Sequence, residues 1–304
     1  MGALDLPSEP DEPDRAERGR DGGDHRSKER DLPDPDERGR AYEAMRAHVS
    51  AETRDEPTGS YWDAVPGFLD RAADLRTRWP ERQAAPDRSD DPPGSFRSRG
   101  GFYLKPERHA ETVAAIGRMR EAEPAISADM QAVERENRHG GWLEGLKFCR
   151  KGDDRLKEKI AERLEGEPDK APTEILSKVP DAIRYTFCLG SETYSEGYYD
   201  IKEWLENCGY QMYESRSAWR AAEYKGINTR WVTTEGQRFE VQFHTAESFH
   251  AKQYVTHDAY ERIRDPQTTG DERGELKAFQ REVCSHIKVP DGAWDIADFK
   301  KEGF

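Results

Sequence analysis

The chain has 304 residues, of which 34% are hydrophobic and 36% are charged, and its mean hydropathy is -1.07. This composition excludes one compact domain throughout, and the net charge of -14 argues against a general binder of nucleic acid or anionic membranes. The four cysteines show no metal-binding spacing, which indicates reduced thiols. No apolar run approaches a membrane span or a signal-peptide core, so we expect no membrane partner and a cytoplasmic site of action.

The N-terminal half divides into polar and helical segments. Residues 1–40 mix charges with Pro and Gly and have almost no large apolar side chain, which predicts a disordered acidic tail. Residues 41–82 carry apolar side chains at helical spacing and predict short helices that cap the main domain or bind a partner. Residues 83–101 are a polar linker. Residues 102–139 predict a helical lead-in, interrupted or kinked near Pro124.

From residue 140 to residue 304, predicted strands and helices alternate. The expected strands are residues 142–149, 181–189, 209–214, 228–232 and 238–245. The expected helices are residues 153–164, 173–178 (with Thr173 as N-cap), 193–208, 246–264 and 271–287. This order predicts an α+β (mixed α/β) domain, in which helices flank a mixed β-sheet.

The two strands at 228–232 and 238–245 form a predicted hairpin at the centre of this domain, because a Gly-containing turn joins them. In the second strand, apolar residues alternate with Glu240, Gln242 and His244. One face of the strand is therefore apolar, and the other carries a carboxylate, an amide and an imidazole. Such a row is either a solvated face or the floor of a site, and periodicity alone slightly favours the solvated face.

Basic residues gather where the strand at 142–149 turns into the next helix. They are Lys147, Arg150, Lys151, Arg155, Lys157 and Lys159. Cationic side chains beside a helix N-terminus suit phosphate oxygens, because the charges and the free N–H groups point the same way. A solvated basic helix face, interleaved with acidic residues, is an equally supported interpretation.

Two acidic positions complete a candidate polyphosphate site. Asp181 and Arg184 lie on a strand that otherwise reads as buried, and an ionised aspartate there needs a partner or a metal. The alternative is an aspartate that caps the strand after Pro180. Asp181 and Glu240, on neighbouring strands, could together bind Mg²⁺ while lysines and arginines hold the phosphates, as phosphoryl transfer requires.

These residues, in this order, resemble the synthetase domain of the RelA/SpoT family, which transfers pyrophosphate from ATP to the 3′-hydroxyl of a nucleotide. The resemblance covers residues 140–290. Its most specific part is residues 239–245, Phe-Glu-Val-Gln-Phe-His-Thr, which is similar to the family's E-[IV]-Q-[IVF]-[RH]-T strand. The resemblance implies a nucleotidyltransferase-like fold. It also implies that Glu240 binds the metal or activates the attacking hydroxyl, with Gln242 and His244 in support.

The resemblance extends to the phosphate-binding residues. Lys151 and Lys159 keep the lysine spacing of the family's ATP-binding pattern, and its leading arginine is displaced to Arg150. Asp181 resembles the family's metal-binding aspartate, and Arg184 resembles the arginine that follows it. The implied cofactor is therefore Mg²⁺.

The acceptor loop departs from the family. Guanosine-specific members have a G-Y-x-S-[IL]-H loop whose tyrosine stacks on the acceptor base, whereas residues 226–231 read Gly-Ile-Asn-Thr-Arg-Trp. Tyr224 or Trp231 is expected to stack instead, so guanine specificity is in doubt and an adenine acceptor becomes plausible. Three further residues are expected to line the acceptor pocket: Lys225, Asn228 and Arg230.

Lys252, His257 and Tyr260 resemble the family's closing segment, and His257 is a supporting candidate. We find no hydrolase H…HD set in the N-terminal region. The resemblance implies a toxin-like nucleotide 3′-pyrophosphokinase whose partners are ATP, a purine nucleotide and a cognate antitoxin or immunity protein. Such a protein acts in its own cytoplasm or in that of a cell to which it is delivered. Two alternatives stay open: pyrophosphorylation of the tRNA 3′ end, which blocks translation, and a catalytically inactive nucleotide sensor or interaction protein.

Overall fold

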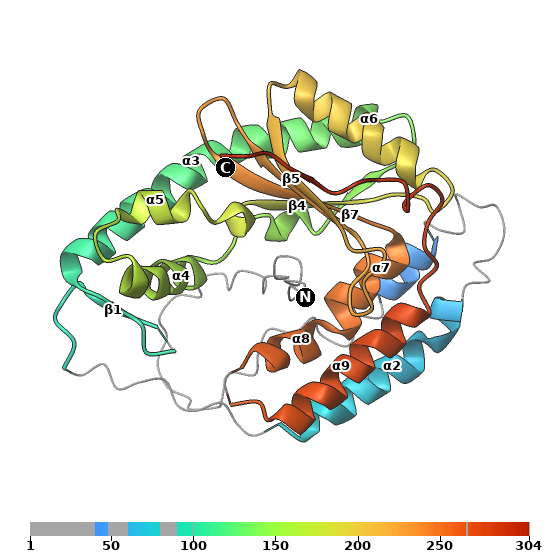
Figure 1. Ribbon diagram of the computed structural model, residues 1–304, viewed down its shortest axis with the longest axis horizontal. Helices are drawn as coiled ribbons and strands as arrows, with labels where there is room; N and C mark the ends of the chain where they lie inside the picture. Colours follow the sequence, from blue (N-terminus) through green and yellow to red (C-terminus); the bar gives the residue numbers. More distant parts are fainter. Residues whose placement is uncertain (1–39, 48–59, 80–89, 99, 266, 304) are drawn as a thin grey trace.

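The computed structural model describes residues 40–47, 60–79, 90–98, 100–265 and 267–303. The predicted tail, apart from its last residue, and the first part of the predicted linker lie outside these ranges. Within them, no helix is both long enough and apolar enough to cross a membrane. Figure 1 shows a twisted sheet with helices on both of its faces.

The sheet has six strands in the order β3-β4-β7-β6-β5-β8. The strands are β3 (Trp142–Glu144), β4 (Arg184–Cys188), β5 (Gln211–Ser217), β6 (Ile227–Val232), β7 (Arg238–His244) and β8 (Phe299–Lys300). β4 and β7 run parallel at the centre, and the other neighbours are antiparallel. β6 and β7 are the predicted hairpin. The α+β prediction, with a mixed sheet flanked by helices, is confirmed.

The helices form two groups on opposite faces of the sheet (Figure 1). The main helices are α2 (Ser60–Thr77), α3 (Pro106–Glu136), α4 (Asp153–Gly166), α5 (Pro172–Leu176), α6 (Tyr194–Asn207), α7 (Ala246–His250), α8 (His257–Arg264) and α9 (Gly270–Ser285). Short helical segments are η1 (Leu146–Phe148), η2 (Pro180–Ala182) and η3 (Ala251–Val255), and a small hairpin joins β1 (Phe96–Arg97) to β2 (Tyr103–Leu104). α3 and α6 cover one face, and the remaining large helices lie on the other side.

The apolar face of the sheet packs on α3 and α6. Phe243 of β7 contacts Tyr198 of α6 with 4.9 Å between ring centroids, and Tyr194 donates a hydrogen bond to the Phe243 carbonyl at 2.9 Å. On α3, Ser127 contacts the Tyr185 hydroxyl of β4 at 3.0 Å. Alternation along β7 therefore directs its phenylalanines into the core and its polar residues to the opposite face.

Replacement of Phe243 by Ala is expected to lower the free energy of unfolding by about 3–5 kcal/mol, because the side chain is fully buried and its removal leaves a cavity. Urea denaturation measures this loss. Val113→Ala is the control, since Val113 is 48% exposed and its truncation should cost less than about 0.5 kcal/mol. A Phe243 variant as stable as the control would contradict this assignment of the core.

Several predicted boundaries are wrong. The strand expected at 142–149 ends at Glu144, because Gly145 adopts a left-handed conformation (φ 65°) and starts the turn η1. Ala171, not Thr173, occupies the N-cap of α5, because the next residue is a proline that suits the first helical position. α3 continues past Pro124 as one helix, where an interruption was expected.

The helix predicted at 246–264 is also wrong as a single element. It consists of α7, the π-helical segment η3 and α8. Thr256 carries a helical backbone conformation with φ -102°, and its N–H bonds the carbonyl of Ala251, five residues earlier. Helical periodicity cannot distinguish this arrangement from a regular helix, because the apolar spacing changes little over one turn.

The N-terminal helices pack against the main domain. α2 lies beside α9 (Figure 1), and the two helices are joined by ion pairs from Arg71 to Glu282 and from Arg78 to Glu275 (3.1 Å). Residues 40–47 are also helical, and the Met45 side chain of this segment is buried in the hydrophobic core. This packing favours the capping interpretation of these helices.

Candidate functional site

The polar face of the sheet carries matched side chains across its central strands. Glu240 of β7 lies between Arg184 of β4 and Arg230 of β6 in the strand register. Glu240, Gln242 and His244 are each 0% exposed, so the solvated-face interpretation is wrong for β7. A buried carboxylate needs charge compensation, and the register partners of Glu240 on both neighbouring strands are arginines.

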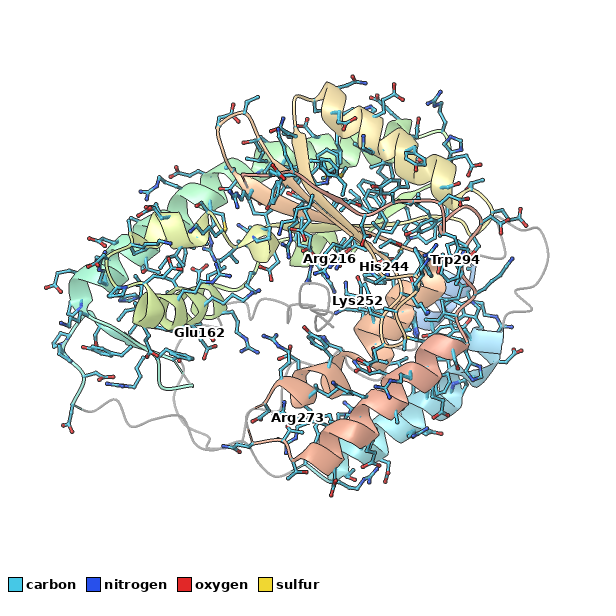
Figure 2. The ribbon with its side chains drawn as sticks, viewed as in Figure 1. Glu162, Arg216, His244, Lys252, Arg273 and Trp294 are labelled. Atoms are coloured by element: carbon cyan, nitrogen blue, oxygen red, sulfur yellow. The ribbon has the colours of Figure 1, made fainter. Side chains whose placement is uncertain are left out.

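Gln242 connects Glu240 to the helical segment η3. The Gln242 Nε2 donates to Glu240 Oε1 at 2.6 Å, and the Lys252 ammonium donates to Gln242 Oε1. Figure 2 shows Lys252 and His244 on the same side of the sheet, away from α3 and α6. The carboxylate is therefore held by a hydrogen-bonded chain that begins on a different element of the fold.

His244 belongs to a second hydrogen-bonded chain. The Tyr224 hydroxyl donates to Asn228 Oδ1 at 2.9 Å, and because a phenol has one proton it accepts from His244 Nε2 at 3.0 Å. His244 Nδ1 then accepts from the Ser248 hydroxyl at 2.9 Å. Burial, followed by the charges of Lys252 and Arg184, lowers the pKa of His244 well below its usual value. The imidazole is therefore neutral, and it positions Tyr224.

The chain from His244 ends at an unsatisfied donor. Asn228 is 4% exposed, and its Nδ2 has no hydrogen-bond partner among the described residues. An unpaired buried amide costs free energy that a ligand acceptor can recover. Asn228, predicted to line the acceptor pocket, thus presents a donor on the same face as Glu240.

The loop before β6 brings Tyr224 close to His244. Gly226 adopts φ 150°, and a Cβ there would lie 2.7 Å from His244 Cε1, so only glycine permits this approach. The Lys225 ammonium donates to the carbonyls of Trp219 (3.1 Å) and Ala221 (2.7 Å), and burial lowers its pKa. The Lys225 side chain, predicted to line the acceptor pocket, therefore closes the loop that carries Tyr224.

Asp181 lies in the turn η2 just before β4, not in the strand as predicted, and two of the basic residues between 147 and 159 pair with it. A bridge between Arg150 and Ile183 aligns the two segments. The Lys151 and Lys159 ammonium groups lie 2.7 and 3.0 Å from Asp181 Oδ2. Burial would raise the pKa of Asp181, but the charges of both lysines and their hydrogen bonds outweigh it and hold the pKa well below its usual range.

Replacement of Asp181 by Asn is expected to lower the free energy of unfolding at pH 7 by about 3 kcal/mol, because two lysines lose a buried partner. A depressed folded-state pKa stabilises the fold above the unfolded value of about 3.9, and this stability is lost as the pH falls through the folded value. Urea unfolding between pH 7 and pH 3 should thus show a smaller acid-dependent loss in the variant. Identical pH dependence in both proteins would contradict this account of the ion pair.

Asp181 and Glu240 lie on adjacent segments, since the Glu240 N–H donates to the Ile183 carbonyl at 2.9 Å. In the part of the chain that the structure describes, no group of three or more acidic, histidine or cysteine side chains could hold a metal ion. Mg²⁺, however, is commonly held by one or two carboxylates together with substrate phosphates. Asp181 and Glu240, on adjacent segments, supply two carboxylates of this kind beside two lysines that suit phosphates.

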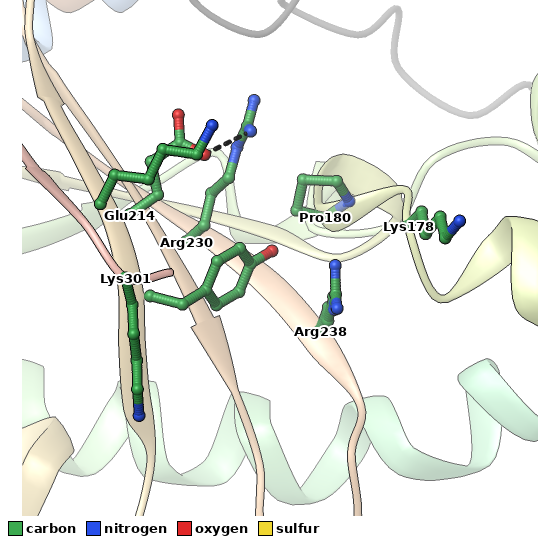
Figure 3. Close-up of a pocket in the computed structure, with 8 residues that line it drawn as sticks. Lys178, Pro180, Glu214, Arg230, Arg238 and Lys301 are labelled. Carbon is green, nitrogen blue, oxygen red and sulfur yellow. Dashed lines mark hydrogen bonds and ion pairs between the residues drawn. The ribbon is translucent and has the colours of Figure 1, made fainter. Parts of the chain in front are cut away.

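A cavity of about 150 Å³ opens at the edge of the polar face (Figure 3). Its lining residues are Lys178, Pro180, Tyr213, Glu214, Arg230, Arg238, Lys300 and Lys301. Glu214 is its one carboxylate and pairs with Arg230 at 2.7 Å, and the Arg238 guanidinium lies 5.1 Å from the centre of the Tyr213 ring. Five cations beside one carboxylate give the lining of this cavity a net positive charge.

Sequence analysis identified only Arg230 among the residues of this cavity. Arg238 could have been found, because it precedes Glu240 by two positions and shares its face of β7. Lys300 and Lys301 could not, because β8 joins the sheet through β5, far earlier in the chain. Such long-range pairing leaves no local signal.

The remaining predicted residues differ in their placement. Trp231 is 0% exposed on the apolar face, so its suggested stacking role is wrong. Arg150 is half-exposed beside the basic segment, with its Nε 3.8 Å from a Glu123 carboxylate oxygen. His257 is buried at the start of α8, the helix that follows η3. Tyr224 lies edge-on to the His244 ring, with 5.5 Å between centroids.

Comparisons with known proteins give structural likenesses only. No family model and no curated protein matches the chain. The type VI effector Tas1, solved with its immunity protein, is 17% identical, with a TM-score of 0.40 and coverage of 58% of this chain and 96% of that chain. A GTP pyrophosphokinase family protein from Streptococcus pneumoniae is 12% identical (TM-score 0.35, coverage 59% and 87%), and smu.1046c from Streptococcus mutans UA159 is 13% identical (0.35, 58% and 88%). Each of these likenesses covers 58–59% of this chain, at identities of 12–17%.

Proposed function

We propose that this chain transfers the pyrophosphate group of ATP to the 3′-hydroxyl of a purine nucleotide. One observation carries the proposal: the fully buried Glu240 lies between two arginines, one strand away from the turn that holds Asp181 and its two lysines. A carboxylate base beside cations that suit phosphates is the division of labour that phosphoryl transfer needs.

The donor nucleotide binds on the side of α4. The ammonium groups of Lys151 and Lys159 lie beside Asp181, in the turn before β4, and their charge suits the phosphates of ATP. Asp181 holds them in place until the nucleotide arrives. They then bind phosphate oxygens, and Asp181 becomes available to Mg²⁺. Arg150, at the same turn, adds a further cation.

In the reaction, the acceptor 3′-oxygen attacks the β-phosphorus of ATP and forms a new P–O bond. The bond between that phosphorus and the oxygen bridging to the α-phosphate breaks, and AMP leaves. Glu240 takes the proton of the 3′-hydroxyl. Arg184 and Arg230, its neighbours in the register, offset the charge that accumulates beside it. A bound Mg²⁺ would neutralise phosphate charge and align the phosphates.

The acceptor binds on the side of β6 and β5. Tyr224 and Asn228 offer a ring and an amide donor for the base or sugar. The cavity adjoins Glu240 in the register, because Arg230 is the partner of Glu240 on β6 and Arg238 is its neighbour on the same face of β7. Its cations suit the 5′-phosphates of an acceptor whose 3′-hydroxyl reaches Glu240. An acceptor with free 5′-phosphates is therefore favoured over an RNA 3′ end.

The experiment that tests the function mixes purified protein, ATP and Mg²⁺ with AMP, ADP, GDP, GTP or bulk tRNA. Anion-exchange chromatography and mass spectrometry resolve the products. A pyrophosphorylated mononucleotide supports the proposal and names the acceptor. A modified tRNA 3′ end would identify RNA, and not a mononucleotide, as the acceptor. Tight ATP binding with no product from any acceptor would support a catalytically inactive nucleotide sensor.

We further propose that the activity arrests growth, because unbalanced pyrophosphate transfer consumes ATP. Expression of the wild-type chain in a bacterial host is then expected to stop growth and lower the ATP pool, whereas Glu240→Gln should permit growth at equal protein level. A producing cell would need a neutralising antitoxin or immunity protein. Growth arrest by both forms alike would remove the link between toxicity and transfer.

A further inference from the structure

The π-helical segment η3 separates α7 from α8 on the polar side of the sheet. A π-helical turn is rare and is frequently found at functional sites. Here it carries Lys252, which is 5% exposed and donates its ammonium hydrogen to Gln242. The segment therefore directs a buried cation at the strand that carries Glu240.

The hydrogen bonds fix the orientation of the Gln242 amide. An ammonium group can only donate, so the Gln242 oxygen must face Lys252. The Gln242 NH₂ group must then face Glu240, and it donates to Oε1 at 2.6 Å. Without Lys252, the amide could turn and direct its oxygen at the carboxylate of Glu240, which would repel it.

Helix α2 holds the segments on both sides of η3. Tyr61 bonds His250 Nδ1 at 2.8 Å, and the Trp62 indole donates to Glu247 at 3.2 Å, both on α7. On α8, Asp258 forms an ion pair with Arg76 at 3.3 Å. Tyr61 and Trp62 are almost fully buried in this contact. The position of η3 thus depends on a distant helix, whose hydrogen bonds to α7 span 185 and 189 residues of the chain.

We propose that Lys252 is a positioning residue that acts through Gln242 on Glu240, and that α2 belongs to the active site because it fixes η3. The inference rests on the proposed function, in which Glu240 accepts the proton of the 3′-hydroxyl. It assigns a task to the N-terminal helices that their own sequence does not indicate.

The expected effect separates turnover from binding. Lys252→Met should lower kcat about 10- to 100-fold, since misplaced catalytic groups cost this much, while KM for ATP changes little because the donor site lies at Lys151 and Lys159.

The experiment compares Lys252→Met with Lys252→Arg in the full chain, because arginine keeps a donor for Gln242. Lys202→Met is the matched control, as Lys202 pairs with Glu206 at 2.7 Å on α6, across the sheet. Wild-type kcat in Lys252→Met would overturn the proposal, and so would an equal loss of kcat in Lys252→Arg and Lys252→Met.

A second readout does not depend on activity. The side-chain amide of Gln242 is buried and hydrogen-bonded at both its oxygen and its nitrogen. Its NH₂ protons, followed in ¹⁵N-correlated spectra, should therefore exchange with solvent slowly in the wild type and fast in Lys252→Met. Gln242→Glu assigns the signal. If the wild type forms no product, the proposed function fails, while this exchange measurement still tests the relay. Equal exchange in wild type and Lys252→Met would overturn the relay.

The part of α2 is tested by Tyr61→Phe and Arg76→Met, which each remove one contact to the segments beside η3. Both should reproduce the drop in kcat of Lys252→Met to a smaller degree, with little change in KM for ATP. Arg71→Met is the control, since Arg71 pairs with Glu282 on the exposed side of α9. Wild-type kcat in both Tyr61→Phe and Arg76→Met would overturn the assignment of α2 to the active site and leave it a purely stabilising role.

Discussion

Replacement of Glu240 by Gln is expected to reduce kcat about 1,000-fold or more, while the fold and ATP binding persist. Glutamine has the shape of glutamate and can still accept from the Gln242 amide, but it cannot take the proton of the 3′-hydroxyl. Steady-state kinetics measures the loss, and near-ultraviolet circular dichroism and calorimetric titration with ATP report the fold and the donor site.

The matched control for this variant is Asp200→Asn. Asp200 is a partly buried carboxylate on α6, on the other face of the sheet, where it pairs with Arg138. Its replacement should leave kcat within about threefold of the wild type, even if stability falls. Equal activity in Glu240→Gln and wild type would remove the base from the mechanism proposed here.

Replacement of Lys151 by Met is expected to weaken ATP binding about 10- to 100-fold. A hydrogen bond to a charged group contributes about 1.5–3 kcal/mol, and 1.4 kcal/mol corresponds to a tenfold change in Kd. Calorimetric titration with ATP in the absence of acceptor measures this change directly. This difference between wild type and variant should shrink at high salt, because salt screens the attraction that Lys151 contributes in the wild type.

Lys157→Met is the control for the donor site. Lys157 lies on α4, as Lys159 does, but its ammonium pairs with Asp154 at 3.1 Å and lies 5.5 Å from the centre of the Phe96 ring. The same charge is removed from the other side of the helix, so ATP affinity should stay within about twofold. Equal losses in both variants would indicate general attraction to a basic segment and no defined phosphate site.

Alternation along single strands predicted much of the site. In β7 it grouped Glu240, Gln242 and His244 on one face. The same rule in β6 sets Asn228 and Arg230 on that face and turns Trp231 into the core, so the stacking role suggested for Trp231 could have been rejected from the pattern. The mixed sheet also followed from the order of the elements.

Other features depend on contacts between distant segments, and the sequence could not reveal them. The position of Lys252 depends on a π-helical turn whose apolar spacing resembles an ordinary helix. The neutral state of His244 follows from its burial and from the charges around it in the folded chain. The pairing of Asp181 with two lysines depends on the bridge between Arg150 and Ile183.

The central claim is the transfer of two phosphoryl groups in one step. ATP labelled in its β-phosphate, incubated with the protein and the acceptor that the panel selects, should give AMP and a labelled product in equal amounts, with both the β- and the γ-phosphoryl groups on the acceptor 3′-oxygen. Mass spectrometry and ³¹P spectra identify both. Release of ADP with transfer of a single phosphoryl group, or labelled inorganic pyrophosphate with no labelled acceptor, would contradict the account.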